Sequence, residues 1–179
     1  MTSNDQRFRP SVTVAAVIHR PGPDGGPVEY LLVQEETVDG LRLNNPAGHL
    51  EPAESPLEGA MREALEETAR VFAPQAWLGC YLSRFQRGAG RGPGGQPVED
   101  VTYLRFAFSG TAGDPIPGRS LDAGIVGTLW LTSDAIRARR AEHRSPLVMR
   151  CIDDHAEGRH LPLEALYVDP SVWQPEQRP

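Results

Sequence analysis

Three glutamates in one short stretch of the chain have a spacing that suits a bound cation. In "REALEETA", Glu63 lies three residues before Glu66 and four residues before Glu67, and Glu66 and Glu67 are adjacent. Like charges at such spacings on a helix repel one another by roughly 0.2 to 0.5 kcal/mol per pair. Carboxylate oxygens are hard ligands that suit Mg²⁺ or Mn²⁺, and a divalent cation would offset the repulsion. From these three residues alone, a solvated acidic helix face remains an equal alternative.

Two neighbouring residues fit the same cation site. Gly48 lies just before an acidic loop, and because it has no Cβ atom its backbone carbonyl can approach a metal closely. Arg62 lies four residues before Glu66, so on a helix its guanidinium can hold that carboxylate in place. The sequence therefore places a main-chain oxygen, an arginine and three acids within about twenty residues.

The acidic segment is predicted to be a helix that begins after Ser55. The letters "SPLE" at residues 55–58 combine an N-cap serine, a proline in the first turn and the glutamate of a capping box. Small and apolar residues then recur at helical spacing and are expected to form the buried stripe: Leu57, Ala60, Met61, Ala64, Leu65 and Thr68. On the same helical wheel the three glutamates occupy a separate face.

Apolar runs predict the remaining elements. Strands are expected at residues 12–19, 28–35, 77–85, 101–110 and 125–133, and further helices from Ser133 or Asp134 and from Ser145. The Gly- and Pro-rich residues 86–100 are expected to form a long mobile hairpin loop. Strands, one helix, strands and then helices predict an α+β fold, a mixed sheet with helices on its faces.

Composition excludes several kinds of protein. The 179 residues are 39% apolar and carry a net charge of -6, which favours one domain and argues against a nucleic-acid partner. All 18 basic residues are arginine, so a lysine-containing phosphate loop and a lysine Schiff base are excluded. No apolar run reaches the length of a membrane span and no secretory signal is evident, so a cytoplasmic protein is expected. Cys80 and Cys151 lack metal or disulfide spacing and are interpreted as buried small hydrophobes.

The spacing around the glutamates resembles the signature of the Nudix hydrolases. Gly48 is followed after five residues by Glu54, and after seven more by "REALEE" at residues 62–67. Two positions depart from the signature, because Ala69 replaces a glycine and Arg70 occupies an aliphatic position. If Ala69 ends the helix with a positive φ, the strain is on the order of 1 kcal/mol, and we expect the helix end to shift instead.

The resemblance implies an α/β/α sandwich with a mixed sheet and a loop-helix-loop metal site. By position, the Gly48 carbonyl, Glu63, Glu66 and Glu67 would bind Mg²⁺, with Mn²⁺ as the alternative ion. Arg62 would orient them, Glu54 would stabilise the loop or act in the outer shell, and Glu63 or Glu67 would be the base. The expected domain spans residues 9–166, between loose termini at 1–8 and 170–179.

Further segments resemble the NudJ branch of this family: "RPSVTVAAVIH", "LVQEETVDG", "NNPAGHLE", "LRFAF" and "RSPLV". This resemblance implies a phosphatase that cleaves phosphoanhydride bonds of nucleoside tri- and diphosphates and of thiamine-type pyrophosphates. The implied partners are a small nucleotide or pyrophosphate substrate and no membrane, in a monomer or small homo-oligomer. The alternatives are an ADP-ribose or nucleoside diphosphate-sugar pyrophosphatase and, from another class, a Nudix sensor that binds a ligand without catalysis.

Residues outside the signature are harder to interpret. His49 and Arg84 are candidate substrate contacts, although a plain loop residue and a solvated arginine are the competing interpretations. Asp114 and Asp122 could each supply a further acid, and the sequence does not choose between them. Glu35 and Glu36 are interpreted as solvated hairpin charges.

Overall fold

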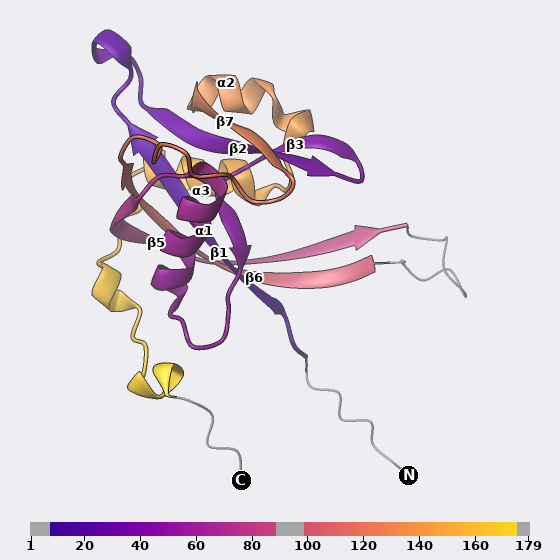
Figure 1. Cartoon of the computed structure of the whole chain (residues 1–179). Coiled ribbons are helices and arrows are strands. Elements are labelled where there is room, and N and C mark those ends of the chain that lie inside the picture. Colours follow the sequence, from indigo (N-terminus) through magenta and orange to yellow (C-terminus); the bar gives the residue numbers. More distant parts are fainter. Residues whose placement is uncertain (1–7, 89–98, 175–179) are drawn as a thin grey trace, which may run out of the picture.

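Seven strands form one mixed sheet in the computed structural model, which describes residues 8–88 and 99–174 (Figure 1). The strands are β1 (Ser11–Arg20), β2 (Glu29–Thr37), β3 (Gly40–Asn44), β4 (Ala47–His49), β5 (Phe72–Arg87), β6 (Glu99–Ala112) and β7 (Ile125–Thr132). β6 pairs parallel with β1 and antiparallel with β5. β2 pairs antiparallel with β3 on one side and with β7 on the other.

The sheet branches at β1, and this branch positions the acidic segment. The first half of β1 pairs with β4 through Thr13 to Ala15, whereas β2 pairs with β1 only at His19 and Arg20. The chain between β3 and β4 therefore passes from one part of the sheet to the other. This crossing delivers Ala47 and Gly48 to the strand beside the acidic helix.

Helices cover both faces of the sheet. This is required because successive side chains of β1 are apolar and point to opposite faces. Val14, Ala16 and Ile18 pack with Ala60 and Ala64 of α1 (Pro56–Thr68). The intervening side chains of β1 face the opposite core, which contains residues of α2 (Ser133–Ala138) and α3 (Leu147–Ala156). The predicted α/β/α sandwich with a mixed sheet is confirmed.

Helix α1 begins as predicted, but its buried face is rotated. The Ser55 hydroxyl accepts from the Glu58 N–H at 3.2 Å, and the Glu58 carboxylate accepts from the Ser55 N–H at 2.7 Å. Met61 was expected in the buried stripe and is 39% exposed, whereas Gly59 and Glu63 are buried. The rotation follows from the preceding loop, which packs along the helix flank where these two residues lie.

The expectation that the end of α1 shifts is wrong. Ala69 is the C-cap in the left-handed region, with φ 55° and ψ 23°, and its N–H donates to the Leu65 carbonyl at 3.0 Å. The loop after β6 fixes this end, because the N–H groups of Ile116 and Asp122 donate to the carbonyls of Ala69 and Glu66 at 2.7 and 3.1 Å. The strained backbone is therefore retained.

Several boundaries differ from the sequence interpretation. β5 and β6 extend to Arg87 and Glu99, and residues 89–98 of the predicted mobile loop lie outside the described residues. Helix α2 is short and is capped by Thr132, whose hydroxyl accepts from the Ala135 N–H at 3.3 Å, instead of by Ser133 or Asp134. The long hairpin of β5 and β6 extends beyond the rest of the sheet (Figure 1).

Two further expectations need correction. Cys151 is buried as predicted, but Cys80 is exposed because it lies on an uncovered part of β5. The carboxy-terminal tail expected to be loose from residue 170 begins with an ordered 3-10 turn, Pro170–Trp173, and the Trp173 indole donates to Glu58 at 2.9 Å. Within residues 8–88 and 99–174, no helix combines the length and apolarity needed to span a membrane.

Candidate active site

Glu63 lies directly against the backbone of Gly48. A Cβ atom at position 48 would overlap the carboxyl carbon and both carboxyl oxygens of Glu63, so no other residue type fits without displacing the carboxylate. The Glu63 residue is only 8% exposed, and this burial raises the pKa of its carboxyl. The first acid of the signature and the glycine that precedes it are thus brought together.

Glu67 binds the adjacent backbone group of the same strand. Its Oε2 accepts a hydrogen bond from the Ala47 N–H at 2.9 Å. Burial raises the pKa of Glu67 to about 8, the Ala47 N–H opposes this rise, and the negative charges of Glu63, Glu35 and Asp122 add to it. Two carboxylates of α1 therefore converge on neighbouring residues of β4.

Arg62 is the cation among these acids. One guanidinium nitrogen, Nη1, donates to Glu63 Oε1 at 2.8 Å and to Glu66 Oε2 at 2.9 Å. The other, Nη2, donates to the His49 carbonyl at 3.0 Å and to Glu54 Oε1 at 2.8 Å, while Nε donates to Glu54 Oε2 at 3.0 Å. Hydrogen bonds to Glu54, above all, raise the pKa of Arg62. This network connects helix, strand and loop through one side chain.

Glu54 connects the acidic loop to the start of α1. Besides its bidentate contact with Arg62, it accepts from the Glu51 N–H at 2.8 Å. A Cβ atom on Gly59 would lie 2.8 Å from Glu54 Oε1, so the glycine leaves room for this carboxylate on the helix surface. The Arg62 guanidinium holds the pKa of Glu54 below its usual range.

The donor set fits a divalent cation. Three carboxylates and the main chain of Gly48 provide oxygen ligands of the kind that Mg²⁺ and Mn²⁺ prefer. Among the residues that the structure describes, no three acidic, histidine or cysteine side chains already form a metal-ligand group, because Glu63 and Glu66 point to Arg62. Gly48 supports the fit most directly, since a side chain there would fill the space next to the carboxylate.

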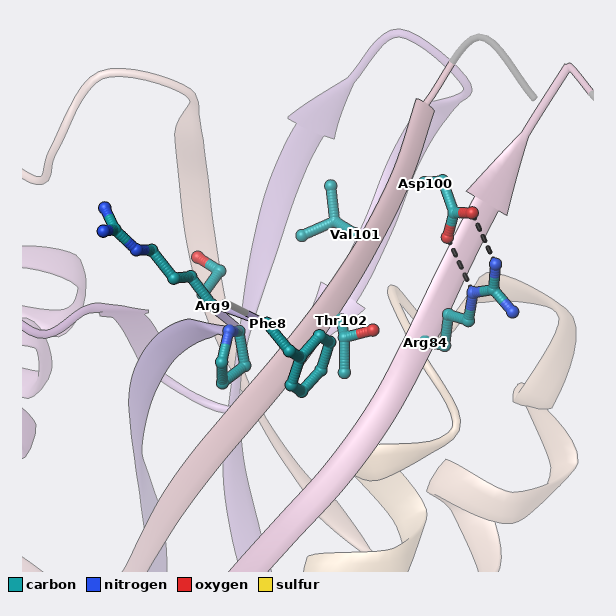
Figure 2. A pocket seen from close by; sticks show the side chains of 8 residues that line it. Phe8, Arg9, Arg84, Asp100, Val101 and Thr102 are labelled. Carbon is teal, nitrogen blue, oxygen red and sulfur yellow. Dashed lines mark hydrogen bonds and ion pairs between the residues drawn. The ribbon is translucent and has the colours of Figure 1, made fainter. Parts of the chain in front are cut away.

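The side chains of the two predicted substrate contacts lie apart from this network, although the His49 carbonyl accepts from Arg62. His49 is exposed on β4, with its ring centroid 6.5 Å from that of Tyr103. Arg84 pairs with Asp100 at 2.5 to 2.7 Å on the β5–β6 hairpin. Figure 2 shows this pair at an open pocket of about 640 Å³, which is lined by Phe8, Arg9, Pro10, Ser11, Arg84, Asp100, Val101 and Thr102. None of the α1 acids lines that pocket.

Three charged residues outside the signature also concern the site: Asp122, Glu35 and Arg105. Asp122 acts electrostatically on Glu63 and Glu67, whereas Asp114 acts on Arg70, so Asp122 is the acid that the loop brings near. Glu35 was interpreted as solvated, but it is partly buried, pairs with Arg144 at 3.2 Å and acts on Glu67. Arg105 was not predicted as a site residue. The sequence feature that could have indicated it is a lone cation within the apolar strand "VTYLRFAF".

Comparison with known proteins decides the family. Residues 9–151 match the family described as the NUDIX domain. The chain belongs to the Nudix family. It is 34% identical over 160 residues to proteins named Phosphatase NudJ from Shigella boydii and Escherichia coli K12, covering 89% of this chain and 92% of each relative. A NUDIX hydrolase structure from Nitrosomonas europaea is 44% identical, with a TM-score of 0.73 over 90% of this chain and 98% of that one.

These similarities confirm the predicted family and the class of enzyme. The chain is a Nudix hydrolase, and the class acts on phosphorus-containing acid anhydrides. The resemblance to the NudJ branch is confirmed as well, because the relatives that carry that name align over most of both chains.

Proposed function

We propose that this Nudix hydrolase is a phosphatase that depends on Mg²⁺ or Mn²⁺ and cleaves nucleoside tri- and diphosphates and thiamine-type pyrophosphates. The observation that carries the proposal is the convergence of Glu63 and Glu67 on the backbone of Gly48 and Ala47, with Glu66 held beside them by Arg62. The name of the NudJ relatives supports a phosphatase as the class of enzyme.

The metal would be held by the Gly48 carbonyl and by the carboxylates of Glu63, Glu66 and Glu67. When bound, such an ion supplies positive charge against the phosphate oxygens and makes water more acidic. Arg62 would then orient the carboxylates, while its own position is held by two hydrogen bonds to Glu54. Glu54 keeps the loop that contains Gly48 in place.

Either Glu63 or Glu67 would act as the general base. In hydrolysis, the oxygen of a water attacks phosphorus, the bridging P–O bond breaks, and the proton of the water passes to a carboxylate oxygen. Such proton transfer contributes about 10²- to 10⁴-fold to the rate. In Glu67 one oxygen accepts from Ala47, which leaves the other available for the proton.

The experiment measures product release from a panel of substrates by the full-length protein. The panel contains nucleoside tri- and diphosphates, thiamine pyrophosphate and ADP-ribose, each with Mg²⁺, with Mn²⁺ and with EDTA. We expect metal-dependent release of inorganic phosphate from the nucleotides and from thiamine pyrophosphate. Release of AMP and ribose 5-phosphate from ADP-ribose as the fastest reaction would favour the pyrophosphatase alternative instead.

The sensor alternative predicts a different result on the same panel. A protein that only binds its ligand would show no metal-dependent turnover on any substrate, although titration calorimetry would still detect binding. The complete set of signature glutamates favours the enzyme.

A further inference from the structure

Arg105 is a buried arginine whose donors are unused among the described residues. It lies in the middle of β6 and is 9% exposed. Its Nε and Nη1 atoms are buried and have no hydrogen-bond partner there. None of the ion pairs within 4.0 Å among the described residues includes Arg105. Keeping a charged group buried without partners costs roughly several kcal/mol, so an unmet role for this side chain is indicated.

The sheet register places Arg105 one strand away from β4, the strand that contacts the acids of α1. Arg105 pairs with Thr13 of β1, and Thr13 in turn pairs with His49 of β4, the residue after Gly48. Directly paired residues of neighbouring strands share a face of the sheet. The Thr13 hydroxyl oxygen is also buried, and it has no hydrogen-bond partner in the part of the chain that the structure describes. Two polar groups without partners among the described residues therefore lie side by side. They are in the same row as His49 of β4, on the face of the sheet that also carries Ala15, Ala107 and α3.

Acids from two other elements act on Arg105. Burial lowers the pKa of Arg105, and Cys151 of α3, then Glu67 of α1 and Glu35 of β2, oppose this electrostatically. Neither acid reaches ion-pair distance of Arg105, so among the described residues no carboxylate neutralises this guanidinium by contact. A buried guanidinium that lacks a partner attracts an anion and can bind it with a planar pair of donors.

We propose that Arg105, assisted by the Thr13 hydroxyl, binds a phosphoryl oxygen of the substrate on the face of the sheet that carries α3, across β1 from the edge strand β4 where Ala47 binds Glu67. The inference rests on the proposed phosphatase function and deepens it, because it adds a fixed cation of the chain to the acids that bind metal. The phosphate would gain charge-assisted hydrogen bonds, and the buried guanidinium would gain the partner that it lacks. Arg105 is thus a substrate-binding residue from outside the signature.

The test uses methylenediphosphonate with Mg²⁺, a probe whose P–C–P bridge resists hydrolysis. Its Kd is measured by titration calorimetry for the wild-type protein, Arg105→Met, Arg105→Lys and Thr13→Val. We expect at least a 10-fold rise in Kd for Arg105→Met, at least threefold for Arg105→Lys, which keeps the charge but loses the planar fork, and a smaller rise for Thr13→Val. Arg137→Met is the matched control, because Arg137 is exposed and pairs with Asp153, away from the site.

Thermal unfolding without ligand separates this role from a structural one. If Arg105 only balances the charge of Glu67 and Glu35, Arg105→Met should lower the Tm and leave the Kd of the folded protein unchanged, which would overturn the proposal. We expect the Tm of Arg105→Met to stay at or above that of the wild type, because an unpaired buried charge is removed. If Arg105→Met does not fold, an unchanged Kd for Arg105→Lys decides against the proposal.

Failure of the proposed function can be told apart from failure of this inference. Binding of the probe needs no turnover, so a wild-type protein that hydrolyses nothing but loses the probe in Arg105→Met would refute the phosphatase and support the phosphate site. Conversely, metal-dependent turnover together with equal probe affinity in the wild type and both Arg105 variants would support the phosphatase and refute the site. A wild-type protein that does not bind the probe also refutes the site.

Discussion

The backbone of Gly48 and the carboxylate of Glu63 occupy adjoining space that no Cβ atom can share. Glu63 comes from the middle of α1 and Gly48 from β4, so this contact fixes the distance between the helix and the strand. The residue before Gly48 contacts the acid one helical turn after Glu63 in a similar way, because the Ala47 N–H donates to Glu67. The signature spacing therefore corresponds to a structural contact: the three-residue strand β4 contacts two acids of α1.

Replacing Gly48 by alanine should abolish most of the activity. The added methyl group would displace the Glu63 carboxylate, and we expect a loss of kcat/KM of about 100-fold or more, with weaker Mg²⁺ binding. Steady-state kinetics over a Mg²⁺ titration measure both effects. Gly113→Ala is the matched control, since a Cβ atom there meets nothing within 4 Å, and it should keep near wild-type rates. Equal rates for the two variants would contradict the steric argument.

Replacing Arg62 by methionine should destabilise the metal-free protein. Glu54, Glu63 and Glu66 would lose their shared cation, and we expect the free energy of unfolding to fall by about 1 to 3 kcal/mol. Urea denaturation with EDTA measures this loss. Saturating Mg²⁺ should recover part of the lost stability, because the bound ion then offsets the repulsion between the acids in place of Arg62.

The control for Arg62 is Arg139→Met, which removes a partly exposed pair with Glu142. Such pairs contribute about 0 to 1 kcal/mol, so the control should change stability little with or without Mg²⁺. If Mg²⁺ stabilised neither the wild type nor Arg62→Met, the assignment of a metal to these acids would be wrong.

Glutamine substitutions at Glu63 and Glu67 should each lower turnover by about 100-fold or more, in line with loss of a base or a metal ligand. The fold should persist, because in Glu67→Gln the amide oxygen can still accept from the Ala47 N–H. Circular dichroism and steady-state kinetics on each variant measure the two properties. Near wild-type rates in both would remove the catalytic role proposed for this helix.

Local rules were sufficient to predict the acidic helix. The capping box at Ser55 and the spacing of the three glutamates depend on contacts within one segment, and the helix begins where they indicate. Met61 was misplaced because its exposure depends on which flank the loop before α1 covers. The signature also predicted that Gly48 and the acids converge, although the sequence contains no direct measure of the distance between them.

Contacts between distant segments could not be predicted in the same way. In the sequence Arg105 is a single charge within an apolar strand, and only the parallel pairing of β6 with β1 places it next to Thr13. Glu35 was misjudged for the same reason, because its ion pair with Arg144 and its electrostatic effect on Glu67 both join segments that are distant in the sequence. Both depend on partners that are far apart in the sequence.

Replacing Ala69 by glycine should stabilise the protein. Ala69 ends α1 in the left-handed region, where a Cβ atom costs roughly 1 to 2 kcal/mol, while the greater freedom of glycine in the unfolded chain returns part of this gain. We expect a net rise of about 1 kcal/mol in the free energy of unfolding, measured by urea denaturation. Ala69→Val should have the opposite sign, and a loss of stability in Ala69→Gly would show that this helix end is not strained.

Acid should destabilise the protein through a stack of histidines remote from the site. His155 lies 4.3 Å from His19 and 4.9 Å from His160, measured between ring centroids, and its Nδ1 is 2.9 Å from the Tyr30 hydroxyl. Burial, and then the positive charge of His19 and His160, lower the pKa of His155 to about 4. The stack joins β1 to α3 and the segment after it.

The direction of this change of stability with pH follows from proton binding. An unfolded histidine takes up its proton near pH 6.5, whereas folded His155 does so near pH 4, so the unfolded state binds more protons between these values. The stabilising contribution is therefore full above pH 6.5 and is lost as the pH falls toward 4. Allowing for the partial exposure of the ring, we expect a loss of about 1 to 2 kcal/mol between roughly pH 6.5 and 4.5.

Urea denaturation at about pH 4.5, 5.5, 6.5 and 7.5 measures this dependence. His155→Gln keeps an acceptor for the Tyr30 hydroxyl but cannot titrate, so its stability should fall less over the same interval. His49→Gln removes an exposed histidine outside the stack and should follow the wild-type curve. If the curves of His155→Gln and the wild type ran parallel, burial of His155 would not be the source of the acid sensitivity.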